Sequence, residues 1–209
     1  MSLGPDLEFT ERMWGYITEG AQTFEEGYLK GKAAGNKLEY RVTIGIDDFD
    51  AFMAPSDGPT GRHVPMTGSA SCENLFGKNR TLRKGAIFGL YWKDPQSGER
   101  RMSYDFQVKD KTGTLYTFRG HKRIVHDAGT FDILEDHTTL FATLEWTEDG
   151  LQKTARGIVY FHLLTDLAPM VLSMFLPKAG NLLDVIDTLA QWKKRLVTVI
   201  RFFLFVSEE

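Results

Sequence analysis

The sequence predicts a mainly β protein, an antiparallel curled sheet or lipocalin-like barrel of about eight strands with C-terminal helices. Apolar side chains alternate strictly with other residues in Leu38–Ile46 and in Met102–Val108, which is the pattern of a half-buried strand. The polar segment Lys109–Gly113 separates two such runs, which predicts a hairpin. After Leu182 the apolar repeat changes to three and four residues, which is typical of a helix.

Length and composition favour one domain with an apolar core. We expect a single domain over residues 1–209, with a barrel-like region at 7–165 and helices at 166–206. The formal charge of -3 gives no electrostatic reason to expect nucleic acid. The single cysteine, Cys72, cannot form an intrachain disulfide, and no basic segment followed by an apolar run opens the chain. The apolar run Phe202–Val206 is far shorter than the about 20 residues that span a bilayer. We therefore expect a cytoplasmic protein without a transmembrane segment.

The first quarter of the chain mixes strands with loops. Leu7–Ile17 and Leu38–Ile46 are expected to be strands. Between them, Thr18–Asn36 contains several glycines, each of which costs a helix about 1 kcal/mol relative to alanine. We predict a loop with short extended pieces there. The acidic segment Asp47–Phe52 lacks the ligand order of a calcium loop, which favours a capped turn, and Ala54–Gly61 is expected to be a loop.

The remaining strands and helices follow from the same patterns. The further predicted strands are His63–Cys72, Leu82–Lys93, Thr114–Gly120, Leu140–Trp146 and Gly157–Leu164. Leu82–Lys93 and Gly157–Leu164 are apolar on both faces, and such strands need cover on each side. The predicted helices Leu167–Phe175 and Leu182–Val206 supply that cover.

Aromatic residues on the central strands predict a pocket for a lipid- or sterol-type molecule, because ligand pockets are concave and mostly apolar. The expected lining residues are Tyr104, Phe106, Tyr116, Phe118, Leu144 and Tyr160. The alternative is that these side chains fill a core without a ligand.

Three histidines, His121, His126 and His162, are the candidates for a general base in an enzyme that acts on a lipid-like substrate. The five-residue offset of His121 and His126 would place them on opposite sides of a strand, so we expect no metal site. The sequence has no glycine-rich phosphate loop or dinucleotide fingerprint. We therefore expect no cofactor, and binding is favoured over catalysis.

An ordered set of segments resembles an accessory region found beside cholesterol-oxidase-like flavoproteins of the GMC (glucose-methanol-choline) oxidoreductase family, sometimes with an α/β-hydrolase module. The segments are FTERMWGY (9–16), VTIGIDDFDAF (42–52), MSYDFQV (102–108), GHK (120–122), EDHTTLFATL (135–144) and GIVYFHLLTDLAPMVLSM (157–174). The sequence departs from that pattern at His137, where a threonine is expected. The resemblance implies a β-rich companion domain in sterol or other lipid metabolism. It implies no flavin chemistry, because the flavin-binding glycine fingerprint is absent.

Two further functions stay open beside lipid binding. One is an interaction or oligomerisation module, in which the helices ending in Phe202–Val206 contact a GMC-type oxidoreductase or a second copy of the chain. The other is the enzyme with a histidine in its pocket.

Overall fold

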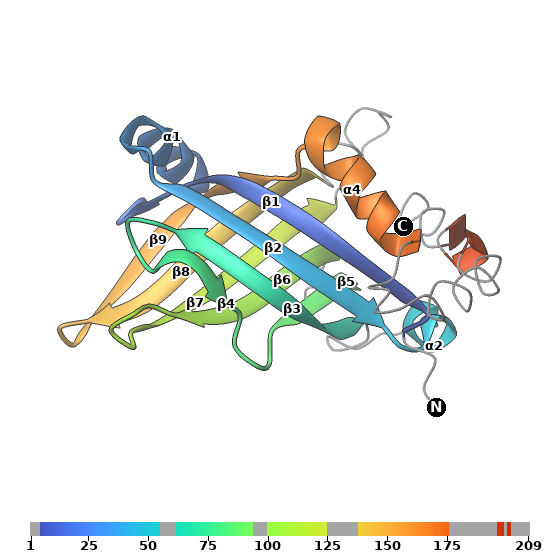
Figure 1. Ribbon diagram of the computed structural model, residues 1–209. Coiled ribbons are helices and arrows are strands. Elements are labelled where there is room, and N and C mark those ends of the chain that lie inside the picture. The colour runs from blue at the N-terminus through green and yellow to red at the C-terminus, as the bar shows by residue number, and fades with distance from the viewer. Residues whose placement is uncertain are drawn as a thin grey trace.

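The computed structural model describes residues 5–54, 62–93, 100–124, 138–175, 196–198, 200 and 201. In this part of the chain, nine strands form one sheet (Figure 1). In chain order they are β1 (Leu7–Glu19), β2 (Lys37–Ile46), β3 (His63–Cys72), β4 (Gly77–Thr81), β5 (Ile87–Lys93), β6 (Arg100–Lys109), β7 (Leu115–Ile124), β8 (Thr139–Glu148) and β9 (Leu151–Tyr160).

Eight of these strands close into a barrel. Their order is β2-β1-β9-β8-β7-β6-β5-β3, and the pairing of β2 with β3 joins the two ends of the sheet. The strands of the ring pair antiparallel throughout, as in an up-and-down barrel. The predicted antiparallel barrel is therefore confirmed. The short strand β4, which pairs with β3 outside the ring, is absent from the sequence prediction.

Aromatic side chains fill the middle of the barrel. The ring centroid of Tyr40 lies 5.7 Å from those of Tyr104 and Phe106 and 5.6 Å from that of Phe118. Phe106 and Phe118 stack at 4.4 Å. Burial raises the pKa of Tyr40 well above its usual value, and its neutral hydroxyl donates to Met13 Sδ at 2.9 Å. Contacts between two aromatic rings contribute about 0.5–1.5 kcal/mol each beyond the burial of their area.

A helix, α1 (Phe24–Ala34), occupies most of the segment Thr18–Asn36, so the prediction of a loop there is wrong. Thr23 caps its first turn by accepting a hydrogen bond from the backbone N–H of Glu26. Gly35 ends the helix in the left-handed conformation, with φ 71°. These two residues are the capping signals that the glycine content of the segment obscured.

The packing of α1 against the barrel explains why this helix contains glycines. Gly27 and Gly31 are buried against β9 and β1, on the outer face of the barrel (Figure 1). A Cβ atom on Gly27 would lie 1.9 Å from the carbonyl oxygen of Arg156, and one on Gly31 would lie 2.5 Å from that of Ile17. The glycines therefore let the helix backbone approach the sheet.

The predicted capped turn at Asp47–Phe52 is confirmed as a short helix, α2 (Phe49–Met53). The side chain of Asp48 accepts a hydrogen bond from the backbone N–H of Ala51 at 2.9 Å. Phe49 and Phe52 are buried and belong to the core cluster. α2 therefore covers the end of the barrel at which β2 finishes (Figure 1).

The C-terminal helix α4 (Leu163–Phe175) begins earlier than the predicted helix Leu167–Phe175. The predicted strand Gly157–Leu164 is instead the end of β9, which stops at Tyr160. Of the predicted helix Leu182–Val206, the structure describes residues 196–198, 200 and 201, which are helical. The other residues of that helix, and 55–61 of the predicted loop Ala54–Gly61, lie outside the described residues.

Candidate functional site

A charged pair lies inside the apolar barrel. Glu11 of β1 and Lys122 of β7 are 4% and 2% exposed. Lys122 Nζ donates to Glu11 Oε1 at 3.0 Å, and the hydroxyl of Tyr104 in β6 donates to Glu11 Oε2 at 2.6 Å. We call Glu11, Tyr104 and Lys122 the interior cluster.

The interior cluster joins opposite walls of the barrel. Between β1 and β6 stand β9, β8 and β7 on one side of the ring, and β2, β3 and β5 on the other. The hydrogen bond from Tyr104 to Glu11 therefore crosses the interior. Removing two charges from water costs several kcal/mol per ion, which a single ion pair often fails to repay. The ion pair is therefore expected to add little to the stability of the core.

Lys122 retains unused hydrogen-bonding capacity. An ammonium group has three N–H donors, and Glu11 is the one acceptor that Lys122 Nζ reaches among the described residues. The remaining contact of this ammonium group is with the ring of Tyr104, whose centroid lies 5.3 Å from Nζ. A molecule inside the barrel with a hydrogen-bond acceptor would satisfy a donor that the described protein groups leave unused.

Most of the predicted lining residues do point inward. Those inside the barrel, each less than a tenth exposed, are Tyr104, Phe106, Tyr116, Phe118 and Leu144. Tyr160 lies on the outer face, where its ring centroid is 5.5 Å from that of Tyr28 in α1, so its predicted inward orientation is wrong. The end of β9 is apolar on both faces because α1 covers its outer face. Contact of these residues with a ligand stays a prediction.

The candidate histidines do not form one site. His121 lies on the outer face of β7, with its ring centroid 5.7 Å from that of Phe141. His162 follows β9 instead of lying within a strand, and its Nε2 is 3.3 Å from the carbonyl oxygen of Trp14. His126 lies outside the described residues. Neither of the two described candidates, His121 and His162, faces the interior cluster.

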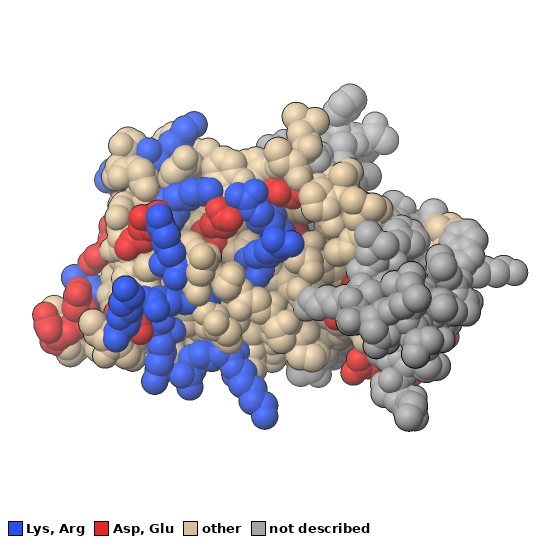
Figure 2. Space-filling view, viewed as in Figure 1, with Lys and Arg blue, Asp and Glu red and all other residues tan. Residues whose placement is uncertain are grey.

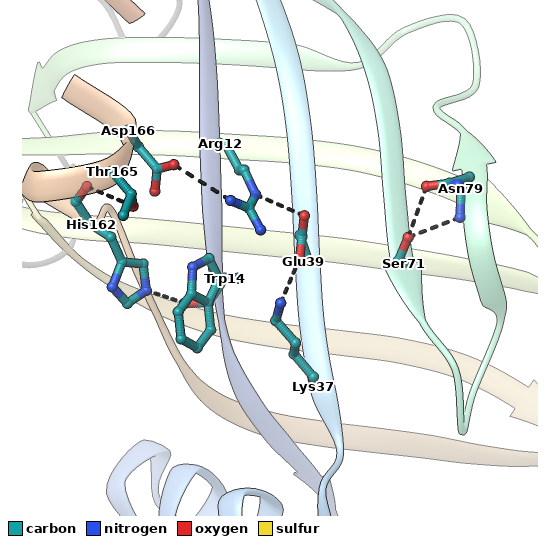
Figure 3. Close-up of polar contacts among 9 residues, drawn as sticks. All are labelled: Arg12, Trp14, Lys37, Glu39, Ser71, Asn79, His162, Thr165 and Asp166. Atoms are coloured by element: carbon teal, nitrogen blue, oxygen red, sulfur yellow. Dashed lines mark hydrogen bonds and ion pairs between the residues drawn. The ribbon is translucent and has the colours of Figure 1, made fainter. Parts of the chain in front are cut away.

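A second polar cluster lies outside the barrel, where α4 meets β1 (Figure 3). Arg12 Nε donates to Glu39 Oε1 at 2.8 Å, and Arg12 Nη1 lies 3.6 Å from Asp166 Oδ1. The hydrogen bond from Arg12, followed by one from Lys37, lowers the pKa of Glu39 below its usual value despite partial burial. Asp166 is 5% exposed, and its Oδ2 has no hydrogen-bond partner among the described residues. Arg12 therefore links α4 to β1 and β2.

Cys72 is a core residue and not a reactive one. It is 1% exposed, and burial raises the pKa of its thiol to about 12. The thiolate, which is the reactive form, is scarce at neutral pH. We expect a disulfide reagent such as DTNB to leave Cys72 unmodified in the native protein and to modify it fully in guanidinium. Rapid modification without denaturant would show that the end of β3 is open.

In the described part of the chain, no three His, Cys, Asp or Glu side chains lie close enough to hold a metal ion. No helix among these residues is long and apolar enough to cross a bilayer. The fold and the interior cluster define a closed up-and-down β-barrel with an ion pair in its core. Comparisons with known protein families, with curated proteins and with solved structures find no match. The likeness to regions beside GMC oxidoreductases therefore stays a prediction.

Proposed function

We propose that the barrel binds a small, mainly apolar molecule whose polar group accepts a hydrogen bond from Lys122. The observation that carries this proposal is the buried ammonium group in an apolar interior, with N–H donors that no described residue beyond Glu11 accepts. A few polar groups in an apolar enclosure are what fixes the orientation of small ligands in proteins. The lipocalin-like form of the barrel and the lipid-binding role are parts of the same proposal.

The charge of the interior cluster selects the class of ligand. Glu11 and Lys122 neutralise each other, so a carboxylate ligand would add an unpaired charge to the core, which is costly. A neutral acceptor, such as the hydroxyl of a sterol or of a long-chain alcohol, adds none. The resemblance to regions beside cholesterol-oxidase-like flavoproteins supports the same class.

The apolar part of the ligand would lie on the α2 side of the interior cluster. The stacked rings of Phe106 and Phe118 occupy the other side. Phe9, Met102 and Leu140 point inward on the α2 side, and we infer that they contact the ligand.

Binding of a fluorescent sterol, dehydroergosterol, tests this proposal. We expect the Glu11→Gln/Lys122→Met variant to bind about tenfold more weakly than the native protein, because a hydrogen bond to a charged group is worth about 1.5 kcal/mol. The matched control is Glu19→Gln/Lys153→Met, which removes an exposed ion pair with an N···O distance of 2.8 Å and should bind normally.

Two outcomes would contradict the proposal. Equal affinities of the two double variants would remove Lys122 from the site. Tighter binding of the fluorescent fatty acid cis-parinaric acid than of the sterol would overturn the ligand class. Extraction of the protein purified from its expression host, followed by mass spectrometry, would identify any ligand that it carries.

A further inference from the structure

In the described part of the chain, the first half of β1 has a neighbouring strand on one side only. β2 pairs with β1 from Leu7 to Tyr16, whereas β9 pairs with it only from Trp14 to Glu19. On the β9 side, residues 7–13 therefore have no neighbouring strand among the described residues. An unpaired strand edge exposes backbone hydrogen-bonding groups, and proteins commonly cover such edges. Here α4 is the cover (Figure 1).

Among the described residues, α4 contacts this edge through its own side chains and through His162, the residue before it. Ser173 Oγ accepts a hydrogen bond from the backbone N–H of Thr10 at 2.8 Å. Arg12 and Asp166 form the 3.6 Å ion pair, and the ring of His162 stacks on that of Trp14 at a centroid distance of 3.9 Å (Figure 3). These contacts are few, and the Arg12 side chain is 40% exposed. None of these contacts belongs to the strand ladder, so separation of α4 from β1 would leave the strand pairing of the barrel intact.

The edge leads directly to the interior cluster. Glu11 lies between Thr10 and Arg12, which both make polar contacts with α4, and its side chain points inward. On the inner side of α4, Met174 is fully buried and Met170 packs against the core. Separation of α4 would therefore uncover the Glu11 side of the proposed ligand site.

The outer side of α4 is also apolar. Leu164, Leu167 and Leu172 are 101%, 39% and 56% exposed. Pro169 lies inside the helix and removes one of its backbone hydrogen bonds, which weakens it. A helix with apolar residues on both sides suits a boundary between a protein core and a second apolar phase.

The surface next to α4 is basic. Lys and Arg side chains gather over β2, β3 and β4 on the face that α4 borders (Figure 2). Arg41 of β2 is exposed and forms no ion pair with another described residue, whereas Lys37 pairs with Glu39 and Lys78 with Glu73. The whole chain carries a formal charge of -3, so this basic face is a local feature. Basic residues beside exposed leucines complement anionic lipid headgroups above acyl chains.

We propose that α4 is a lid that docks on an anionic lipid bilayer through Leu164, Leu167 and Leu172, and that docking opens the β1 edge to a ligand from the bilayer. The passage of ligand rests on the proposed function, whereas the docking does not.

Co-sedimentation with vesicles tests the docking. We expect the native protein to bind vesicles that contain phosphatidylserine more tightly than vesicles of phosphatidylcholine alone. Leu164→Glu/Leu172→Glu should lower this binding by about 30-fold or more. The matched control is Leu29→Glu/Leu151→Glu, at leucines 65% and 64% exposed elsewhere, which should bind normally. Failure of the native protein to bind would overturn the docking. An equal loss of vesicle binding in the control would also overturn it. So would a leucine variant that binds vesicles normally and differs from the native protein only in being a monomer instead of a dimer.

A reversible lock tests the lid. In Thr10→Cys/Ser173→Cys, where the Thr10 backbone N–H lies 2.8 Å from Ser173 Oγ, a disulfide would tie α4 to β1. In the control Thr10→Cys/Thr43→Cys it would tie β1 to β2, where the two hydroxyls are 2.9 Å apart. We expect the first disulfide alone to slow the uptake of dehydroergosterol from vesicles by about tenfold or more, with full recovery in reductant. Equal uptake by both oxidised variants would overturn the lid. Vesicle binding by a native protein that binds no sterol would contradict the proposed function and leave the docking intact.

Discussion

Replacing Lys122 by methionine is expected to destabilise the protein by about 3–5 kcal/mol, because the Glu11 carboxylate would stay buried without its partner. The side chains of Lys122 and Glu11 are 3% and 6% exposed, so water cannot take over the role of the ammonium group. Methionine has a similar length and no charge, and it should keep the contact with the Tyr104 ring. Urea unfolding followed by circular dichroism measures the loss.

The double variant Glu11→Gln/Lys122→Met separates the cost of an unpaired charge from the worth of the pair. We expect it to be within about 1 kcal/mol of the native protein, because replacing a whole buried pair by neutral groups is often neutral. Lys153→Met, which breaks an exposed pair, should cost less than about 1 kcal/mol. If Lys122→Met were as mild as Lys153→Met, the interior cluster would have to be solvated.

A pair that adds little to stability needs another reason to be in a core. The proposed binding of a polar ligand group would be such a reason, because the Lys122 ammonium group has N–H donors that no described residue accepts. The stability and sterol-binding experiments on one double variant therefore bear on the same question. Near-native stability with weakened binding is the combination that the proposed function requires.

The sequence could predict the strands because each has a buried and an exposed face. Leu38–Ile46 shows this alternation and forms β2 almost to its predicted ends. Closure of the barrel was harder to foresee, since the pairing of Trp14 with Tyr160 joins residues far apart in the chain. At Tyr160 the alternation of apolar and polar residues does not show which face is inward, because the outer face is also apolar where α1 covers it.

Two residues of the interior cluster are recognisable in the sequence as charged residues at inward strand positions. The pattern of apolar residues alone does not take them into account. Glu11 stands between Phe9 and Met13 at an inward position of β1, and Lys122 stands at an inward position of β7. A charged residue at such a position points to a buried polar site. Their partnership could not be predicted, because β1 and β7 are not neighbours in the ring and meet only across the barrel.

The glycines of α1 misled the prediction for a different physical reason. Each glycine destabilises a helix by about 1 kcal/mol relative to alanine. Gly27 and Gly31 therefore counted against a helix in the sequence. Close approach to the sheet offsets this cost, because Tyr28 of the same helix gains contacts with Tyr16 and Tyr160. The spacing of four residues, which puts both glycines on one side of a helix, was the signal for such packing.

Gly27→Ala is accordingly expected to destabilise the protein by about 3 kcal/mol, although alanine is the better helix former. The new Cβ would lie 1.9 Å from the carbonyl oxygen of Arg156, so α1 must lift from the barrel and loosen the contacts of Tyr28. Lys30→Ala, at an exposed position of α1 that pairs with Glu26, is the control and should change stability by less than about 0.5 kcal/mol. Urea unfolding of both variants is the measurement. A Gly27→Ala variant that is more stable than the native protein would mean that α1 does not pack on β9 through its glycines, and the outer cover of Tyr160 would then need another explanation.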